Sequence, residues 1–90
     1  MSALDVTFVT ADRTVWSGQA SMVVVPAIDG SMGVLPQMQP TLAVLDSGLV
    51  RITAVEGEPL ERRVHGGFVS VDGDVVTIAV DDAERVAVNA

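Results

Sequence analysis

The sequence contains no cysteine, lysine or tyrosine, and only one histidine among its 90 residues. Without cysteine the chain can form no disulfide, no thiol nucleophile and no thiolate metal site. Without lysine it can form no Schiff base, no P-loop phosphate contact and no biotinyl or lipoyl attachment. The missing lysine therefore excludes the lysine-linked carrier domains, which are often small, acidic and all-β.

Positive charge is scarce. All five basic residues are arginines, twelve residues are acidic, and the formal net charge is −7. Such a chain repels phosphate backbones, so we expect no nucleic-acid partner. No apolar stretch approaches the roughly 18–20 residues of a membrane span, and no basic leader precedes an apolar run. We therefore expect a cytoplasmic chain that is soluble in itself.

Hydrophobic residues make up 49% of the chain, and valine is the commonest of them. Valine is branched at Cβ and favours pleated strands. A chain of this length makes one domain, residues 1–90, with a single thin core. Its first segment shows the expected pattern, because Leu4, Val6 and Phe8 alternate with polar residues. This period of two predicts a half-buried strand.

Short apolar segments separated by turn residues continue to the end of the chain. Asp72–Asp74 predicts a tight hairpin turn, and Glu56–Pro59 a hairpin loop. The tail after Asp81 can begin a helix at Asp82 or form a last strand through Val86 and Val88. Counting the segments gives nine or ten short strands and no convincing helix, which predicts an all-β fold, a β-sandwich or flattened barrel.

The segment from Val25 to Pro40 interrupts this pattern, because it holds three of the four prolines together with Gly30 and Gly33. Proline lacks an amide donor and glycine weakens a regular element. We expect a shaped loop or a bent edge here, and loops held by a rigid scaffold are where binding tends to occur.

Few residues are candidates for chemistry. His65 has no second histidine or cysteine with which to form a catalytic or metal site. The acidic residues near the end of the chain do not follow the spacing of a calcium loop; they are Asp72, Asp74, Asp81 and Asp82. We therefore predict no catalytic residue, no metal, no cofactor and no small-molecule ligand.

One alternative is an aspartic protease. Asp46, Ser47 and Gly48 follow an apolar strand, as in homodimeric proteases of the viral type. Two such carboxylates across a dimer axis would share a proton and activate water. The same three residues also form an ordinary turn between strands. A generic β-sandwich adaptor is a further alternative.

Taken together, five motifs resemble the epsilon subunit of the F-type ATP synthase in order and spacing across nearly the whole chain. The matching segments are Ser17–Gly18; Asp29–Pro36; Pro40–Leu42; Ser47–Gly48 with Arg51 and Ile52; and Gly66–Phe68 with Val71, followed by Val76–Asp81. The resemblance implies a ten-stranded β-sandwich that is not an enzyme. It also implies a subunit of the rotor's central stalk that binds the gamma subunit and the ring of c subunits. As part of the synthase, the chain would lie on the cytoplasmic face of the cell membrane and couple proton flow to ATP synthesis.

The resemblance also implies site residues. Candidates for the gamma interface are Thr10, Met38, Pro40 and Leu42, and candidates for the c-ring interface are Asp29, Gly30 and Ser31. The acidic side chain of Asp29 would suit the partly basic loops of the family's ring.

Two departures from the family pattern are visible. The family's glycine and histidine between the two prolines are replaced by Gln37 and Met38. Family members also commonly continue into a pair of carboxy-terminal helices that can inhibit ATP hydrolysis and in some cases bind ATP. The sequence reaches only Ala90, so we expect this chain to lack hairpin inhibition and nucleotide binding.

Overall fold

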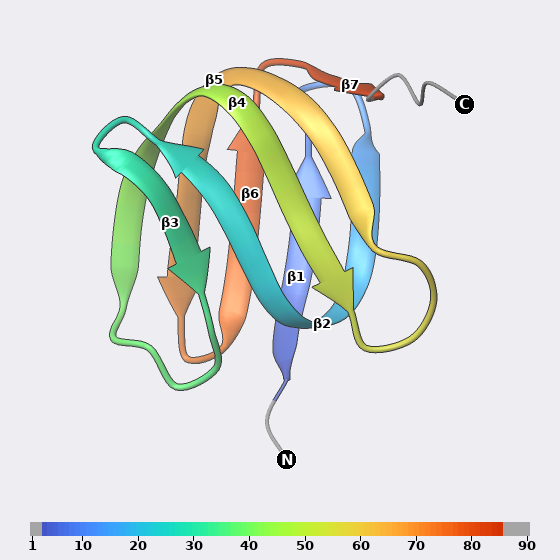
Figure 1. The fold of residues 1–90 in the computed structure, drawn as a ribbon, viewed down its shortest axis with the longest axis vertical. Coiled ribbons are helices and arrows are strands. Elements are labelled where there is room, and N and C mark those ends of the chain that lie inside the picture. The colour runs from blue at the N-terminus through green and yellow to red at the C-terminus, as the bar shows by residue number, and fades with distance from the viewer. Residues whose placement is uncertain (1–2, 86–90) are drawn as a thin grey trace.

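The computed structural model describes residues 3–85, which form seven strands joined by turns (Figure 1). In chain order the strands are β1 (Leu4–Val9), β2 (Thr14–Ala27), β3 (Gly30–Val34), β4 (Thr41–Ala54), β5 (Leu60–Asp72), β6 (Val75–Val80) and β7 (Ala83–Arg85). The predicted all-β class is confirmed. Between residues 3 and 85 there is no helix long and apolar enough to cross a membrane.

The strands are fewer and longer than the sequence suggested, because β2, β4 and β5 each join two segments that were counted separately. Glycines that were interpreted as breaks lie inside these strands. A Cβ at Gly48 would come within 2.6 Å of the Cβ of Pro26, so the missing side chain lets β4 pass close to β2. Asp46–Gly48 lies within β4 and does not form the predicted turn.

The sheet closes on itself. Its strand order is β1-β6-β5-β4-β2-β3, and β1 also pairs with β2. The first half of β4 pairs with the second half of β5, and the second half of β4 pairs with the first half of β5. Figure 1 shows that these two long strands stay side by side and bend together from one layer of the sandwich into the other.

The turn after β5 is built as the sequence predicts. Gly73 and Asp74 both have positive φ angles, 55° and 67°. Two consecutive residues of this kind are typical of the tight turn whose twist matches a hairpin. The carbonyl of Asp74 also accepts a hydrogen bond of 2.8 Å from the amide of Asp5 at the start of β1. At the other end of the chain β7 is a short strand, and Val86 and Val88 lie outside the described residues.

The core is made of inward-facing side chains from both layers, and none of its buried residues between 3 and 85 is polar or charged. Its largest fully buried side chains are Phe8, Leu4, Ile52 and Ile78. Burying one such side chain stabilises the fold by about 1.5–3 kcal/mol. The alternation predicted for the first strand is confirmed, because Leu4, Val6 and Phe8 are all buried.

Candidate interaction surfaces

The outer side of the layer formed by β1, β6, β5 and the first half of β4 carries no charge over two rows of cross-strand neighbours. The first row is Val44, Phe68, Ala79 and Val9, and the second is Leu42, Ser70, Thr77 and Thr7. Leu42 is 73% exposed, Val44 57% and Phe68 45%. We call these eight residues the uncharged face.

Three of the residues predicted to face gamma lie on or beside this face. Leu42 belongs to it, and Thr10 directly follows Val9 at one corner. Pro40 is exposed and stands just before β4, at the opposite border of the layer. The Oγ1 atom of Thr10 accepts hydrogen bonds of 3.3 Å from the amides of Asp12 and Arg13 and so fixes a turn at the end of β1.

Of this face, sequence reasoning identified only Leu42, and it missed the two other large exposed apolar residues, Val44 and Phe68. Both stand in apolar runs, in which inward and outward positions look alike. A signal was available in β5, because a period of two that buries Val69 and Val71 places Phe68 on the outer side.

Met38, the fourth predicted gamma contact, has a different environment. Its side chain is partly buried and packs against the core, and its sulfur accepts a hydrogen bond of 3.3 Å from the amide of Leu35. The neighbouring Gln37 has a φ of 70°, and its amide donates a hydrogen bond of 2.7 Å to Oδ1 of Asp74. Met38 therefore helps to shape the loop between β3 and β4, and a charge introduced there would disturb the loop itself.

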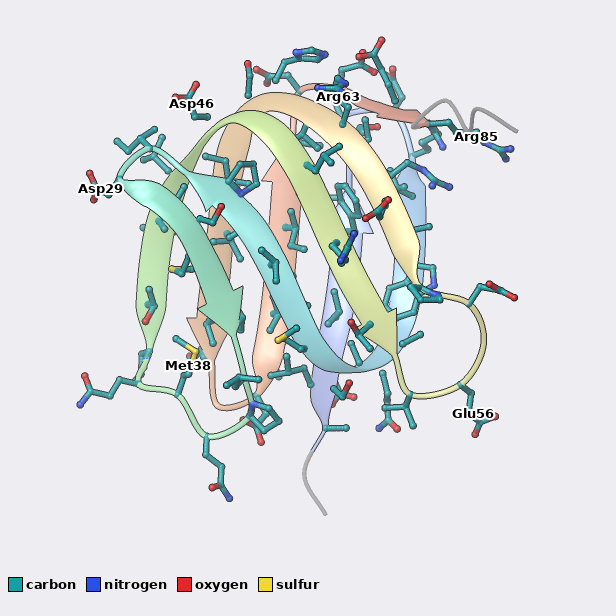
Figure 2. The ribbon with its side chains drawn as sticks, viewed as in Figure 1. Asp29, Met38, Asp46, Glu56, Arg63 and Arg85 are labelled. Atoms are coloured by element: carbon teal, nitrogen blue, oxygen red, sulfur yellow. The ribbon has the colours of Figure 1, made fainter. Side chains whose placement is uncertain are left out.

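Four exposed aspartates lie at one end of the barrel, where β2 and β6 end and where β4 passes from its first half to its second. Ala27, Leu45, Gly67 and Val80 are cross-strand neighbours, and the aspartates follow this row at Asp29, Asp46, Asp81 and Asp82. We call these four residues the acidic end. Figure 2 shows Asp29 and Asp46 together at the end of the molecule opposite Met38. None of the four forms an ion pair with another residue between 3 and 85.

The residues predicted for the c ring lie at this end, because Asp29 is in the turn between β2 and β3 and Gly30 and Ser31 begin β3, exposed. The sequence did not reveal that Asp46, Asp81 and Asp82 lie beside them. Asp46 was interpreted as a turn residue, and Asp81 and Asp82 only as acidic residues that do not form a calcium loop. The register of β4, β5 and β6 alone brings the three to the same end.

The described residues offer no arrangement for catalysis. Asp46 is exposed on the continuous strand β4, and its Oδ1 accepts a hydrogen bond of 2.8 Å from the amide of Ser47. His65 contacts Oε1 of Glu84 at 2.6 Å, with both side chains about half exposed. No group of three potential metal ligands exists within residues 3–85. A shallow hollow of about 340 Å³ has Glu56 as its single titratable residue; it is lined by Trp16, Ser17, Gly18, Gln19, Val55 and Glu56.

Similar sequences are named as chains of one enzyme complex. The ATP synthase epsilon chain of Streptomyces griseus is 46% identical over 81 residues, which cover 90% of this chain and 65% of that one. The ATP synthase epsilon chain of Micrococcus luteus is 42% identical over 83 residues, covering 92% of this chain and 91% of that one. This chain thus spans about two thirds of the length of the first relative and nearly all of the second.

A chain within a solved assembly has the same fold. A chain in the structure of the Euglena gracilis mitochondrial ATP synthase, OSCP/F1/c-ring in rotational state 1, superposes with a TM-score of 0.84 at 22% sequence identity. The match covers 92% of this chain and 53% of that one. At this identity the likeness shows that the two chains share a fold.

The family described as "ATP synthase, Delta/Epsilon chain, beta-sandwich domain" matches residues 3–86. This match and the named relatives confirm the predicted resemblance. Epsilon chains are non-catalytic subunits, so the prediction that this chain is not an enzyme by itself is confirmed. The chain belongs to the ATP synthase delta/epsilon family, and residues 3–86 are its β-sandwich domain.

Proposed function

We propose that this chain is a non-catalytic subunit of the rotor's central stalk in an F-type ATP synthase. It binds the gamma subunit through the uncharged face and the c ring through the acidic end. By joining the two it helps to couple proton translocation to ATP synthesis, and it is held peripherally at the cytoplasmic face of the cell membrane. The observation that carries the proposal is an exposed, charge-free sheet face on a chain with a net charge of −7.

The uncharged face suits a stable protein contact. It spans four neighbouring strands, a width of about 14 Å at the usual strand spacing. Leu42, Val44 and Phe68 remain largely exposed on it. Contiguous exposed apolar surface rimmed by polar residues marks interaction sites on soluble proteins. The rim is present, since Asp5 of β1 and Asp72 of β5 lie just beyond the second row, on either side of Val75 of β6.

The acidic end adjoins the uncharged face. Val44 and Phe68 form one cross-strand pair of the face. The adjacent pair, Leu45 and Gly67, belongs to the row that the aspartates follow. A partner lying against the face and a second partner beyond the end can therefore be contacted at the same time. The exposed carboxylates Asp29 and Asp46 are complementary to basic polar loops such as the family's ring presents.

In this function residues 1–90 act as one domain, without a cofactor or small molecule. Between residues 3 and 85 the chain is built of strands and turns. The inhibition of ATP hydrolysis that the family's helical hairpin provides is therefore not expected of this domain by itself.

Binding to gamma tests the proposal directly. The purified chain is expected to form a one-to-one complex with the gamma subunit of the same organism at micromolar concentration, measured by calorimetry. Tagged in cells, it should copurify with the rest of the synthase. No complex at that concentration would contradict the stalk function. Cleavage of peptides that is lost in Asp46→Asn would instead support the protease alternative.

Charge at the acidic end is expected to affect binding to the ring. The double variant Asp29→Asn, Asp46→Asn should weaken binding to detergent-solubilised c rings about three- to tenfold at low salt, and less at high salt, because exposed charges are screened. The matched control is the double variant Glu56→Gln, Glu58→Gln, which removes the same amount of charge from the loop after β4. Figure 2 shows Glu56 at the opposite end from Asp29 and Asp46. Equal weakening by both double variants would show that net charge, and not this end, attracts the ring.

A further inference from the structure

Most of the positive charge of this acidic chain is gathered on one part of its surface. Four of the five arginines lie on the second half of β4, the first half of β5 and β7: Arg51, Arg62, Arg63 and Arg85. With the two glutamates of the same segments, Glu61 and Glu84, this region has a charge of +2. The ten other carboxylates and Arg13 leave −9 on the rest of the chain, which accounts for the total of −7.

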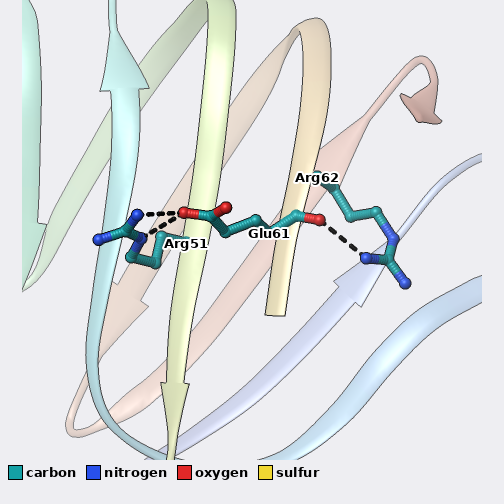
Figure 3. A network of polar contacts seen from close by, with 3 residues as sticks. All are labelled: Arg51, Glu61 and Arg62. Atoms are coloured by element: carbon teal, nitrogen blue, oxygen red, sulfur yellow. Dashed lines mark hydrogen bonds and ion pairs between the residues drawn. The ribbon is translucent and has the colours of Figure 1, made fainter. Parts of the chain in front are cut away.

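The carboxylates of both glutamates in this region already have partners other than Arg62, Arg63 and Arg85. Glu61 forms an ion pair with Arg51, whose Nε also donates to it at 2.6 Å. Glu84 is held by His65 at 2.6 Å. Figure 3 shows that the side chain of Arg62 points away from the carboxylate of Glu61 and that its Nη1 donates to the carbonyl of Glu61 at 2.8 Å. Within residues 3–85, no ion pair neutralises Arg62, Arg63 or Arg85.

Two of these arginines oppose each other. Arg62 on β5 and Arg85 on β7 are direct cross-strand neighbours in the antiparallel pairing. Like charges in this position destabilise a sheet, whereas an added carboxylate between two guanidinium groups can accept hydrogen bonds from both. Arg63 is exposed on the other side of the same strand. Its cross-strand neighbours are Leu49 of β4, which is 40% exposed, and Glu84 of β7, whose carboxylate contacts His65. Arginines beside exposed apolar residues are typical of protein interfaces.

We infer that Arg62, Arg63 and Arg85, here called the arginine edge, form a third docking surface that takes an acidic, extended segment of a partner protein. Carboxylates of the segment pair with Arg62 and Arg85. In the described residues β7 is hydrogen-bonded to β5 alone, so the segment can lie along its outer side. The edge lies on the first half of β5 and on β7, whereas the uncharged face uses the second half of β5.

Other anionic partners fit less well. A nucleic acid or an anionic membrane would meet the −9 of the remaining surface and be repelled. Phosphate sites in proteins use concave, glycine-rich loops or helix ends. The arginine edge lies instead on paired strands, and residues 3–85 contain no helix. An acidic segment of a protein presents separate carboxylates that match separate guanidinium groups.

The test uses a synthetic peptide of alternating glutamate and threonine, titrated at low salt into the labelled chain by NMR. The Nε–Hε signals of Arg62, Arg63 and Arg85 are expected to shift, and that of Arg13 is not. The double variant Arg62→Gln, Arg85→Gln should weaken binding about tenfold or more, equivalent to at least ~1.4 kcal/mol, because both guanidinium groups that pair with the carboxylates are lost. The control Arg13→Gln should bind as the parent does.

A stability measurement separates this role from a structural one. Because it removes a like-charged pair, the double variant is expected to melt at the same temperature as the parent or higher. If the double variant fails to fold, the single variant Arg85→Gln, exposed on β7, carries the same binding test. Three results would overturn the inference: equal loss of binding in Arg13→Gln, equal binding of a glutamine–threonine peptide, or equal shifts of the three arginine signals with inorganic phosphate. Each is independent of whether gamma binds.

Discussion

Gly67→Ala is expected to destabilise the fold severely. Gly67 has a φ of +137°, and a Cβ there would lie 2.2 Å from the carbonyl oxygen of Ala79 and 2.7 Å from the Cα of Val80. Both neighbours are backbone atoms of β6, which pairs with β5 at this residue, so no side-chain rotation can relieve the clash. The variant should lose more than about 3 kcal/mol of unfolding free energy, a large part of the 5–15 kcal/mol of a typical domain. Urea unfolding followed by the fluorescence of Trp16, the single tryptophan, measures this loss.

Gly33→Ala is the matched control. Gly33 lies on the edge strand β3, and nothing stands within 4 Å of a Cβ built on it. Its φ is not positive, so alanine is accommodated and the unfolding free energy should change by less than about 1 kcal/mol. Equal stability of the two variants would contradict the close approach of the β5 and β6 backbones at Gly67.

Val44→Glu is expected to abolish strong binding to gamma and to leave the fold intact. Val44 is 57% exposed, so the free subunit can solvate a charge there, whereas the proposed interface would bury it beside Phe68. An uncompensated charge in an apolar contact costs several kcal/mol, and we expect the Kd for gamma to rise about 100-fold, equivalent to ~2.7 kcal/mol. Calorimetry gives the Kd, and thermal unfolding should show an unchanged Tm. This prediction rests on the proposed function.

Val55→Glu makes the same chemical change at a similarly exposed site. Val55 is 52% exposed and follows the far end of β4, on the hollow lined by Trp16 rather than on the uncharged face. The control should keep the parent's affinity for gamma. If Val44→Glu and Val55→Glu weakened binding equally, acidity in general would be the cause, and the uncharged face would not be the gamma contact.

Features that depend on neighbours along the chain could be predicted from the sequence. The alternation of Leu4, Val6 and Phe8 gave the first strand and its buried face correctly. Asp72–Asp74 gave the turn after β5, because the two residues with positive φ are the short Gly-Asp pair that such turns favour.

The number of strands could not be predicted in the same way. Gly66–Gly67 and Asp46–Gly48 have the composition of strand breaks, yet β5 and β4 continue through them. Whether a strand ends at a glycine depends on whether its partner continues alongside. Here the two irregular segments face each other, with Leu45 opposite Gly67 and Ser47 opposite His65. Both strands therefore bend together and stay paired.

The sequence indicated only some residues of the uncharged face and of the acidic end, for a related reason. The resemblance to the epsilon subunit indicated Leu42 and Asp29, which lie on the uncharged face and at the acidic end. It did not indicate Val44, Phe68 or Asp46. Apolar runs hide which residues point outward, and a sequence does not show which turns meet at the same end of a barrel.

By itself, the sequence determined the all-β class, the lack of thiol and amine chemistry, and the resemblance to the epsilon family, because each depends on composition or on motifs in chain order. Only the tertiary structure decided which valines and which phenylalanine remain exposed, which four aspartates share one end, and which two arginines face each other. Those outcomes depend on strand register and on closure of the sheet by the β1–β2 and β1–β6 pairings. Both are contacts between residues far apart in the chain, and their free energy comes from burying one common core.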